Sequence, residues 1–255
     1  MKTLKKTVLV ALLLFSTLFV QAQDEKKVQA YWIHEDRVKP SMVEEYEQVT
    51  KDLVAKCTEH NIQETKWLTV AQNDHTYLYV TPMEKFAEFD ENQFATLGEK
   101  MGTEEMGKLF ARFNPCYDVH GDYVVYLHKE LSHMPGGINQ NPEGQYYRKF
   151  FIDYVSPANQ KGYMAGMKKI KELLAKNNAK LEYRVYRTGL GVMDSYFMIA
   201  FAAESGAAFE QIMDETWEAT KDEFGPLITE LRKSISRSEE KSGWMRGDLG
   251  YAPKK

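Results

Sequence analysis

Two short stretches, LHKELSHMP at residues 127–135 and MRGDLGYAP at residues 245–253, decide the fold. When they are aligned, their shared leucine and proline lie 118 residues apart, Leu131 with Leu249 and Pro135 with Pro253. Other stretches recur in the same order at nearly the same spacing, namely VKPSMVEEY (38–46) with VSPANQKGY (155–163), and DHTYLYV (74–80) with DSYFMIA (194–200). An ordered series at one period predicts a duplicated unit.

Each predicted copy has the same order of elements. The stretches at 28–35 and 145–155 are rich in aromatic and β-branched residues, which is typical of strands. A helix follows each strand, beginning near Pro40 and Pro157. The apolar faces of these helices hold Tyr46, Val49, Leu53 and Cys57 in one copy, and Tyr163, Met167, Ile170 and Leu174 in the other. A hairpin, a second helix and a last strand complete a β-α-β-β-α-β order, the ferredoxin-like plan.

The second helices carry breaks, at Gly102 in one copy and at Gly225-Pro226 in the other. The copies are expected at residues 24–135 and 143–255, joined by a Pro- and Gly-rich linker at 136–142. Their strands carry large apolar residues on both faces, too many for a face in contact with water. The predicted fold class is therefore α+β, with two tandem ferredoxin-like units whose sheets pack face to face as an intramolecular α+β barrel.

This element order, and a proline followed six residues later by a tyrosine after each first strand (40 to 46 and 157 to 163), resembles the dimeric α+β barrel superfamily. The resemblance covers nearly the whole mature chain and implies two facing sheets with helices outside. Members of that superfamily include cofactor-less monooxygenases of the antibiotic-biosynthesis type, muconolactone-isomerase-like enzymes, haem enzymes of the chlorite-dismutase kind and proteins without known activity. No catalytic residue transfers from it by position, because a shared fold does not fix a function.

The first 22 residues have the pattern of a secretory signal peptide. Three lysines precede an apolar or small-hydroxyl run from Val8 to Val20, and Val20-Gln21-Ala22 supplies small side chains at a cleavage site. The sequence thus predicts a secreted or periplasmic protein that has no membrane segment after cleavage behind Ala22. The mature chain holds 30 basic and 37 acidic side chains, a net charge of −7 that disfavours binding to nucleic acid or to an anionic membrane.

Only two cysteines, Cys57 and Cys116, are present, which excludes a disulfide-dense scaffold. If the first and third strands of the unit run parallel, the two cysteines lie at the same end and a disulfide can join them. The alternative is that Cys57 is a small apolar residue of the buried helix face.

The space between the two sheets is the expected pocket. If Ile33, Phe150 and Ile152 point toward the helices, the residues expected to face the pocket are Trp32, His34, Lys149, Phe151, Asp153, Trp67, Tyr77, Tyr79, Tyr126, His128, Arg184 and Tyr186. From these we expect the ligand-binding residues to be Trp32, His34, Trp67, Tyr79, His128, Lys149 and Arg184. His34 and His128 are candidates for acid–base work, and they are expected to approach each other across neighbouring strands. The alternative is a filled core between the sheets.

The stretch DVHGD (118–122) sets Asp118, His120 and Asp122 at alternate positions, a pattern that suits metal ligation on a strand. The favoured interpretation is a solvated turn centred on Gly121, so no metal site is predicted. The sequence identifies no catalytic residue and no cofactor, and it leaves the oligomeric state open. Three functions remain, namely binding of a small organic molecule between the sheets, a cofactor-less oxygenase or isomerase using the same pocket, and a structural or interaction protein.

Overall fold

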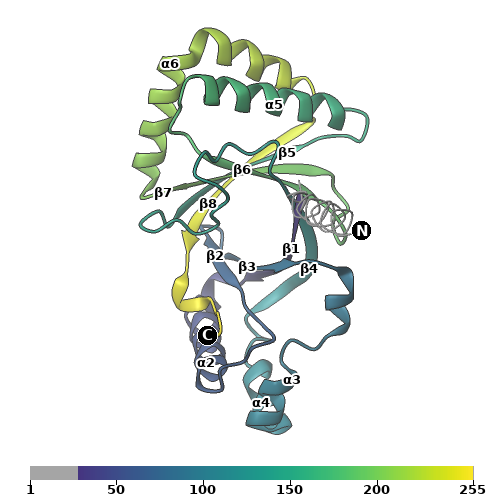
Figure 1. Ribbon diagram of the computed structural model, residues 1–255. Coiled ribbons are helices and arrows are strands. Elements are labelled where there is room, and N and C mark those ends of the chain that lie inside the picture. Colours follow the sequence, from purple (N-terminus) through teal and green to yellow (C-terminus); the bar gives the residue numbers. More distant parts are fainter. Residues whose placement is uncertain (1–27, 255) are drawn as a thin grey trace, which may run out of the picture.

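A computed structural model describes residues 28–254, so the predicted signal peptide (1–22) lies outside the described residues. The described chain is a mixed α+β structure in which eight antiparallel strands form a closed barrel and five helices lie outside it (Figure 1). None of the helices from residue 28 to residue 254 is long and apolar enough to cross a membrane.

The N-terminal half, up to residue 128, has the order β-α-β-β-α-β with its second helix in two pieces. Its elements are β1 (Val28–Val38), α2 (Val43–Glu59), β2 (Leu68–Gln72), β3 (Thr76–Met83), α3 (Ala95–Met101), α4 (Thr103–Ala111) and β4 (Tyr117–His128). The C-terminal half has the same order with one long second helix. Its elements are β5 (Tyr147–Tyr154), α5 (Gln160–Lys176), β6 (Tyr183–Thr188), β7 (Tyr196–Ala203), α6 (Gly206–Arg232) and β8 (Arg237–Met245).

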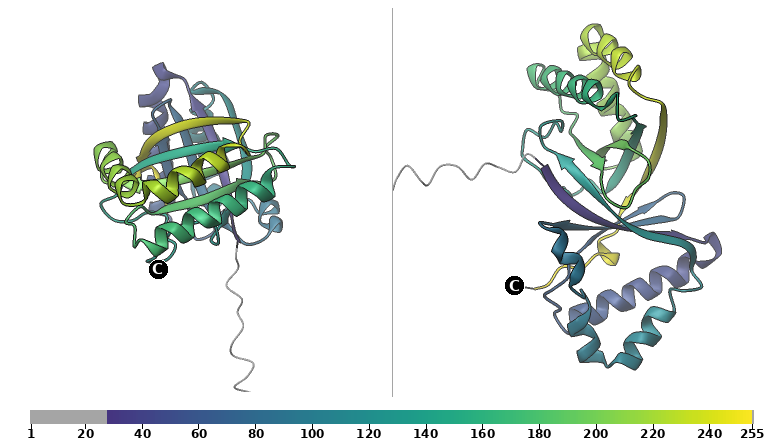
Figure 2. Two further views of the ribbon diagram at one scale, coloured as in Figure 1. Left: turned by 90° about the horizontal axis from the view of Figure 1, so that it is seen from above. Right: turned by 90° about the vertical axis from the view of Figure 1, so that its right-hand side faces the viewer.

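The strand order around the barrel is β1-β3-β2-β8-β5-β7-β6-β4, with every neighbouring pair antiparallel. The four strands of each half are contiguous, and the halves join at both edges, where β4 pairs with β6 and β8 pairs with β2. The two sheets are therefore one continuous barrel. Helices α2, α3 and α4 cover one outer side, and α5 and α6 cover the opposite side (Figures 1 and 2).

The two stretches that opened the sequence analysis lie at these junctions. Leu131 follows β4 but is fully buried in the core under α5 and α6, whereas Leu249 follows β8 and is fully buried in the core under α2 and α4. The backbones that continue from them pair across the halves in the same way, His133 with Tyr183 and Tyr251 with Trp67. Each stretch thus packs into the half to which it does not belong in sequence.

The expected helix faces are confirmed. The buried residues of α2 include Tyr46, Val49, Leu53 and Cys57, and those of α5 include Tyr163, Met167, Ile170 and Leu174. Gly102 separates α3 from α4 with a φ of 87°, a conformation that glycine adopts without strain. The expected break at Gly225-Pro226 was wrong, because α6 continues through Pro226 and bends over its length (Figure 1).

The expected direction of the strands was also wrong. The first and third strands, β1 and β3, run antiparallel, so the argument that brought the two cysteines to the same end does not hold. Cys57 and Cys116 are both fully buried free thiols in the core under α2 and α4.

The barrel interior is packed with apolar side chains from both halves. Ile33 and Phe150 lie there with Tyr31, Leu78 and Leu127, and Ile152 packs against the same cluster. The cavity at the centre of the interior is only about 60 Å³, too small for an organic molecule of ordinary size. A wider hollow of about 670 Å³ shares Leu78, Ile152 and Met198 with it. The predicted faces of β1 and β5 are wrong: Ile33, Phe150 and Ile152 line the interior, and Trp32 and His34 face the helices instead. On β6 the prediction holds, since Arg184 and Tyr186 face the interior.

Candidate functional site

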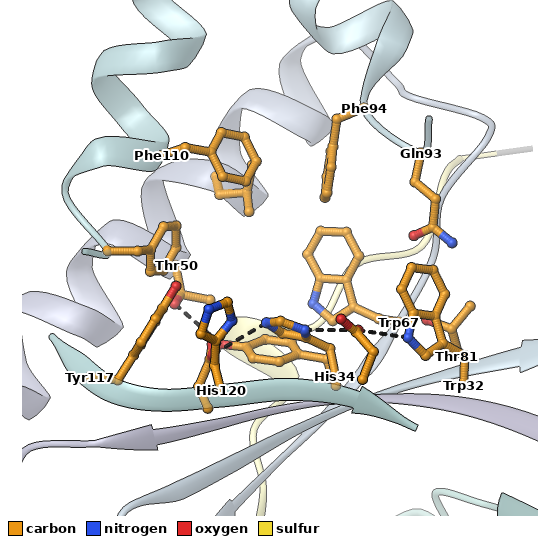
Figure 3. A pocket seen from close by; sticks show the side chains of 15 residues that line it. Trp32, His34, Thr50, Trp67, Thr81, Gln93, Phe94, Phe110, Tyr117 and His120 are labelled. Atoms are coloured by element: carbon orange, nitrogen blue, oxygen red, sulfur yellow. Dashed lines mark hydrogen bonds and ion pairs between the residues drawn. The ribbon is translucent and has the colours of Figure 1, made fainter. Parts of the chain in front are cut away.

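A pocket of about 370 Å³ lies between the sheet of the N-terminal half and its helices (Figure 3). This volume falls in the range of small-molecule sites. Its lining is mostly aromatic, with polar groups along the sheet, and comprises Trp32, His34, Asp36, Thr50, Leu53, Trp67, Tyr79, Thr81, Gln93, Phe94, Phe110, Phe113, Tyr117, His120 and Asp122.

The break at Gly102 shapes the side of the pocket that faces the sheet. The second helix of this half is split into the short α3 and α4, whereas α6 of the C-terminal half is one continuous helix. Phe94, which precedes α3, and Phe110 of α4 lie across the pocket from His34 (Figure 3). The aromatic roof therefore comes from the two helix pieces, and the polar floor comes from the strands.

The floor is a connected set of polar side chains. On β1, Trp32, His34 and Asp36 point to one face because alternate residues of a strand do so. The indole Nε1 of Trp32 donates to Oδ1 of Asp122 over 2.7 Å, and Nδ1 of His34 lies 3.0 Å from the same oxygen. Nε2 of His34 lies 3.2 Å from Oδ1 of Asp36.

The buried side of Asp36 is held by two tyrosines. The hydroxyl of Tyr46 on α2 donates to Oδ2 of Asp36 over 2.6 Å and lies 2.6 Å from the hydroxyl of Tyr79. Thr50 extends this chain, with its hydroxyl 3.4 Å from that of Tyr79. Because Asp122 contacts Nδ1 and Asp36 contacts Nε2, the two carboxylates hold the His34 ring in one orientation.

These contacts shift the pKa values of the floor. Burial lowers the pKa of His34, but its hydrogen bond with Asp122 and the charges of Asp36 and Asp122 outweigh burial and raise it to about 10. Burial raises the pKa of Asp122, but the hydrogen bond and charge of His34 and the hydrogen bond from Trp32 have the larger, opposite effect. The pKa of Asp122 therefore lies below the ordinary value. Burial also raises the pKa of Tyr79.

The stretch DVHGD is part of strand β4, so its interpretation as a solvated turn was wrong. Asp118 pairs with Lys39 over 2.8 Å, outside the pocket lining. His120 lies opposite Asp36 in the register of β1 and β4, with its Nδ1 4.0 Å from Oδ1 of Asp36. The three alternate residues of this stretch thus contact three different partners.

Four of the seven residues expected to bind a ligand lie together in this pocket: Trp32, His34, Trp67 and Tyr79. Figure 3 labels the first three of them. They face the helices rather than the opposite sheet. Trp67 is held in place by a hydrogen bond from its Nε1 to the carbonyl of Leu249 over 2.8 Å.

The other three expected residues lie elsewhere. His128 is buried against Phe197 in the C-terminal half, and it pairs with Val28, six residues along β1 from His34 and thus about 20 Å away. The expected approach of His34 and His128 was therefore wrong. Lys149 forms an ion pair with Glu240 over 2.6 Å on the outer face of the barrel. Arg184 is buried in the barrel interior, where it donates to the carbonyl of Asn139.

The sequence analysis did not select several residues of the site, chiefly Asp36, Thr50, Phe94, Phe110 and Gln93. A signal for Asp36 was present, because an aspartate lies ten residues before the first-helix tyrosine in both halves, Asp36 before Tyr46 and Asp153 before Tyr163. The aromatic residues of the loop and helices carried no comparable signal, since apolar residues on a helix face are expected in any core.

No protein-family model matches the chain, and no curated protein matches it. Solved structures do match over most of its length. An anthrone oxidase-like protein superposes with a TM-score of 0.57 at 13% identity, covering 87% of this chain and 92% of that one. A presumed monooxygenase from Fusobacterium nucleatum superposes with a TM-score of 0.52 at 14% identity, covering 89% of this chain and 98% of that one. At these identities the likeness shows a shared α+β barrel fold.

Proposed function

We propose that the protein binds a planar aromatic small molecule in the pocket of the N-terminal half. The observation that carries the proposal is a comparison of the two halves at matched positions of the strand register. His34 pairs with Tyr79, whereas Phe151 pairs with Ile199 at the matching place in the C-terminal half. Similarly, Thr81 opposite Trp32 corresponds to Phe201 opposite Lys149.

The C-terminal half fills the corresponding space with aromatic rings. Phe151, Phe201 and Phe209 pack with ring centroids 5.2–6.4 Å apart. In the N-terminal half, His34 and Thr81 occupy the places of Phe151 and Phe201, and a cavity lies beside them. The same framework forms a filled core in the C-terminal half and a cavity in the N-terminal half. Because an empty cavity costs stability, its presence supports a binding function.

The lining supports a definite class of ligand. Trp32, Trp67, Phe94 and Phe110 offer ring faces and edges for stacking. The Gln93 amide and the Tyr117 hydroxyl offer hydrogen bonds at the edge of the pocket. A planar molecule with two or three fused rings and one or two hydroxyl or keto oxygens suits this arrangement. The names of the two neighbours, an anthrone oxidase-like protein and a presumed monooxygenase, agree with such a ligand.

An oxygenase-like activity on the bound molecule is the second candidate. It is favoured by the position of His34, whose ring lies at the floor of an otherwise aromatic pocket between two carboxylates. Formation of product from a bound hydroxylated aromatic compound in air, compared with the same mixture under nitrogen, separates this activity from binding alone.

We further propose that the two halves are duplicated units with boundaries near 24–135 and 143–255, joined by residues 136–142. The matching strand registers and the reciprocal pairings of Tyr251 with Trp67 and of His133 with Tyr183 support this. The signal-peptide pattern supports export to the periplasm or beyond, followed by cleavage after Ala22. The intact mass of the protein purified from its own host tests the cleavage.

Tryptophan fluorescence tests the binding proposal, because Trp32 and Trp67 line the pocket. We expect 1-hydroxyanthraquinone to quench this emission saturably. Thr81→Phe introduces the ring that the C-terminal half carries, and it should weaken binding about 10-fold or more, since it fills space the ligand needs. Thr58→Phe, on the exposed side of α2, is the matched control and should bind as the parent does. Quenching that Thr81→Phe leaves unchanged would contradict the proposal.

A further inference from the structure

A carboxylate oxygen in the floor of the pocket is short of a partner. Asp36 is almost fully buried, and Tyr46 satisfies its Oδ2. Its Oδ1 is buried and accepts no hydrogen bond from any described residue, although Nε2 of His34 lies 3.2 Å away. This contact is an ion pair when the ring is protonated, but it does not meet the geometry of a hydrogen bond. A buried carboxylate oxygen without a donor is costly, so its surroundings require an explanation.

The C-terminal half shows how the same framework satisfies such an aspartate. Asp153 accepts from Tyr163 at Oδ2 over 2.7 Å and from the Ser238 hydroxyl at Oδ1 over 2.6 Å. Ser238 lies opposite Asp153 in the register of β5 and β8, as His120 lies opposite Asp36 in that of β1 and β4. The N-terminal half thus has an imidazole where the C-terminal half has the hydroxyl that completes the carboxylate.

We propose that His34, Asp36 and His120 bind one first-row divalent transition-metal ion at the floor of the pocket. One ligand atom from each of these residues lies within 4.8 Å of the other two. Two imidazoles and one carboxylate are the donors that such ions prefer, whereas Mg²⁺ and Ca²⁺ prefer oxygen donors alone. Three protein ligands leave a coordination position open, and the pocket lies beside them.

One of the distances already has the value that this geometry requires. Donors about 2.0–2.2 Å from an ion, at angles between octahedral and tetrahedral, lie about 2.8–3.6 Å from one another. The 3.2 Å between Nε2 of His34 and Oδ1 of Asp36 falls in this range. Nδ1 of His120 is 4.0 Å from Oδ1, and its half-exposed side chain (53%) has room to close the remaining few tenths of an ångström.

The groups behind the ligands are also in place. A metal-bound histidine usually donates its second ring N–H to a carboxylate, which fixes the ring. Nδ1 of His34 lies 3.0 Å from Asp122, and Trp32 donates to that same carboxylate over 2.7 Å. The hydroxyl of Tyr46 likewise donates a hydrogen bond to the carboxylate of Asp36. Trp32, Asp122 and Tyr46 therefore act as positioning residues.

Titration of the chelator-treated, untagged protein with Zn²⁺ in a calorimeter tests the proposal, and the ligand-field absorption of bound Co²⁺ reports the donor set. We expect one ion per chain. His120→Ser, which copies the C-terminal half, should abolish binding while keeping the fold, because the serine hydroxyl can satisfy Oδ1. Asp36→Asn should also abolish it. Asp122→Asn should weaken binding by about 10–100-fold, as is typical of groups behind metal ligands.

His60→Ala, at the end of α2 and outside the cluster, is the control for adventitious histidine binding and should leave the affinity unchanged. The absence of saturable Zn²⁺ binding by the parent would overturn the proposal, as would binding that His120→Ser retains. A thermal melt of each variant shows whether it is folded, and Zn²⁺ should raise the melting temperature of the parent but not that of His120→Ser. These titrations contain no organic compound, so their failure leaves the binding of an aromatic molecule untouched.

Discussion

Replacement of Leu249 by alanine should destabilise the half of the protein that precedes it in sequence. The Leu249 side chain is fully buried, and it packs in the core formed by α2, α4 and their strands. The chain that carries it, however, continues from β8 of the C-terminal half. The variant therefore tests whether Leu249 stabilises the half that it contacts or the half to which it belongs in sequence.

The magnitude follows from complete burial. A buried leucine truncated to alanine costs about 2–5 kcal/mol, and the upper part of this range applies where the surroundings cannot collapse. Trp67 is held by its hydrogen bond to the Leu249 carbonyl, and Tyr251 is held by two others, so the site is rigid. We expect a loss of about 3 kcal/mol, which lowers the melting temperature of a chain of this size by about 6–12 °C.

Urea denaturation measures the free energy, and hydrogen exchange read by mass spectrometry locates the effect. Leu249→Ala should accelerate exchange in α2 and β2, whereas Leu131→Ala should accelerate it in α5 and β6, because Leu131 is buried in the other core. Leu190→Ala, at a side chain 63% exposed, is the control and should change stability by less than about 0.5 kcal/mol. A loss below about 1 kcal/mol, or faster exchange confined to α5 and α6 in Leu249→Ala, would refute the reasoning.

Three further predictions concern single groups. Burial and the charge of Arg187 lower the pKa of His128 below 6.5 in the folded protein. As the pH falls below 6.5, His128 is protonated first in the unfolded state, so the free energy of unfolding decreases. His128→Gln should remove that part of the pH dependence in urea titrations. Gly102→Ala should cost about 1–2 kcal/mol because φ is 87°, whereas Gly107→Ala, inside α4, should stabilise by about 0.5–1 kcal/mol in the same titrations. Tyr163→Phe should cost about 1.5–3 kcal/mol by leaving Asp153 one donor short, and an unchanged midpoint would contradict this.

The sequence predicted the elements whose patterns are local. The buried faces of α2 and α5 follow from apolar spacing, and the hairpin between β2 and β3 follows from Asn73-Asp74. The order β-α-β-β-α-β in each half followed from these elements. Local spacing was sufficient here because a helix with one apolar face has a single way to bury it.

The faces of the strands could not be predicted in the same way. Both faces of β1 are covered, one by the barrel interior and one by the helices, so polarity does not alternate along it. Trp32 and Ile33 are then equally suitable for either side, and a shift by one residue exchanges every side chain. The sequence analysis grouped Trp32, His34, Trp67 and Tyr79 together, and they do share one face of the sheet. It assigned that face to the space between the sheets, whereas the face is directed toward the helices.

The position of the pocket follows from how the barrel divides its two kinds of space. The interior is packed by residues of both halves, such as Ile33 and Phe150, so a cavity opened there would weaken both. The pocket between the sheet and the helices of the N-terminal half is lined by residues of that half alone. Two differences change that space. The second helix is split at Gly102, and Thr81 lies where the other half has Phe201. Neither difference shifts the register of the barrel strands. A closed barrel built from two similar halves can therefore keep one half as a filled support and open the other for binding.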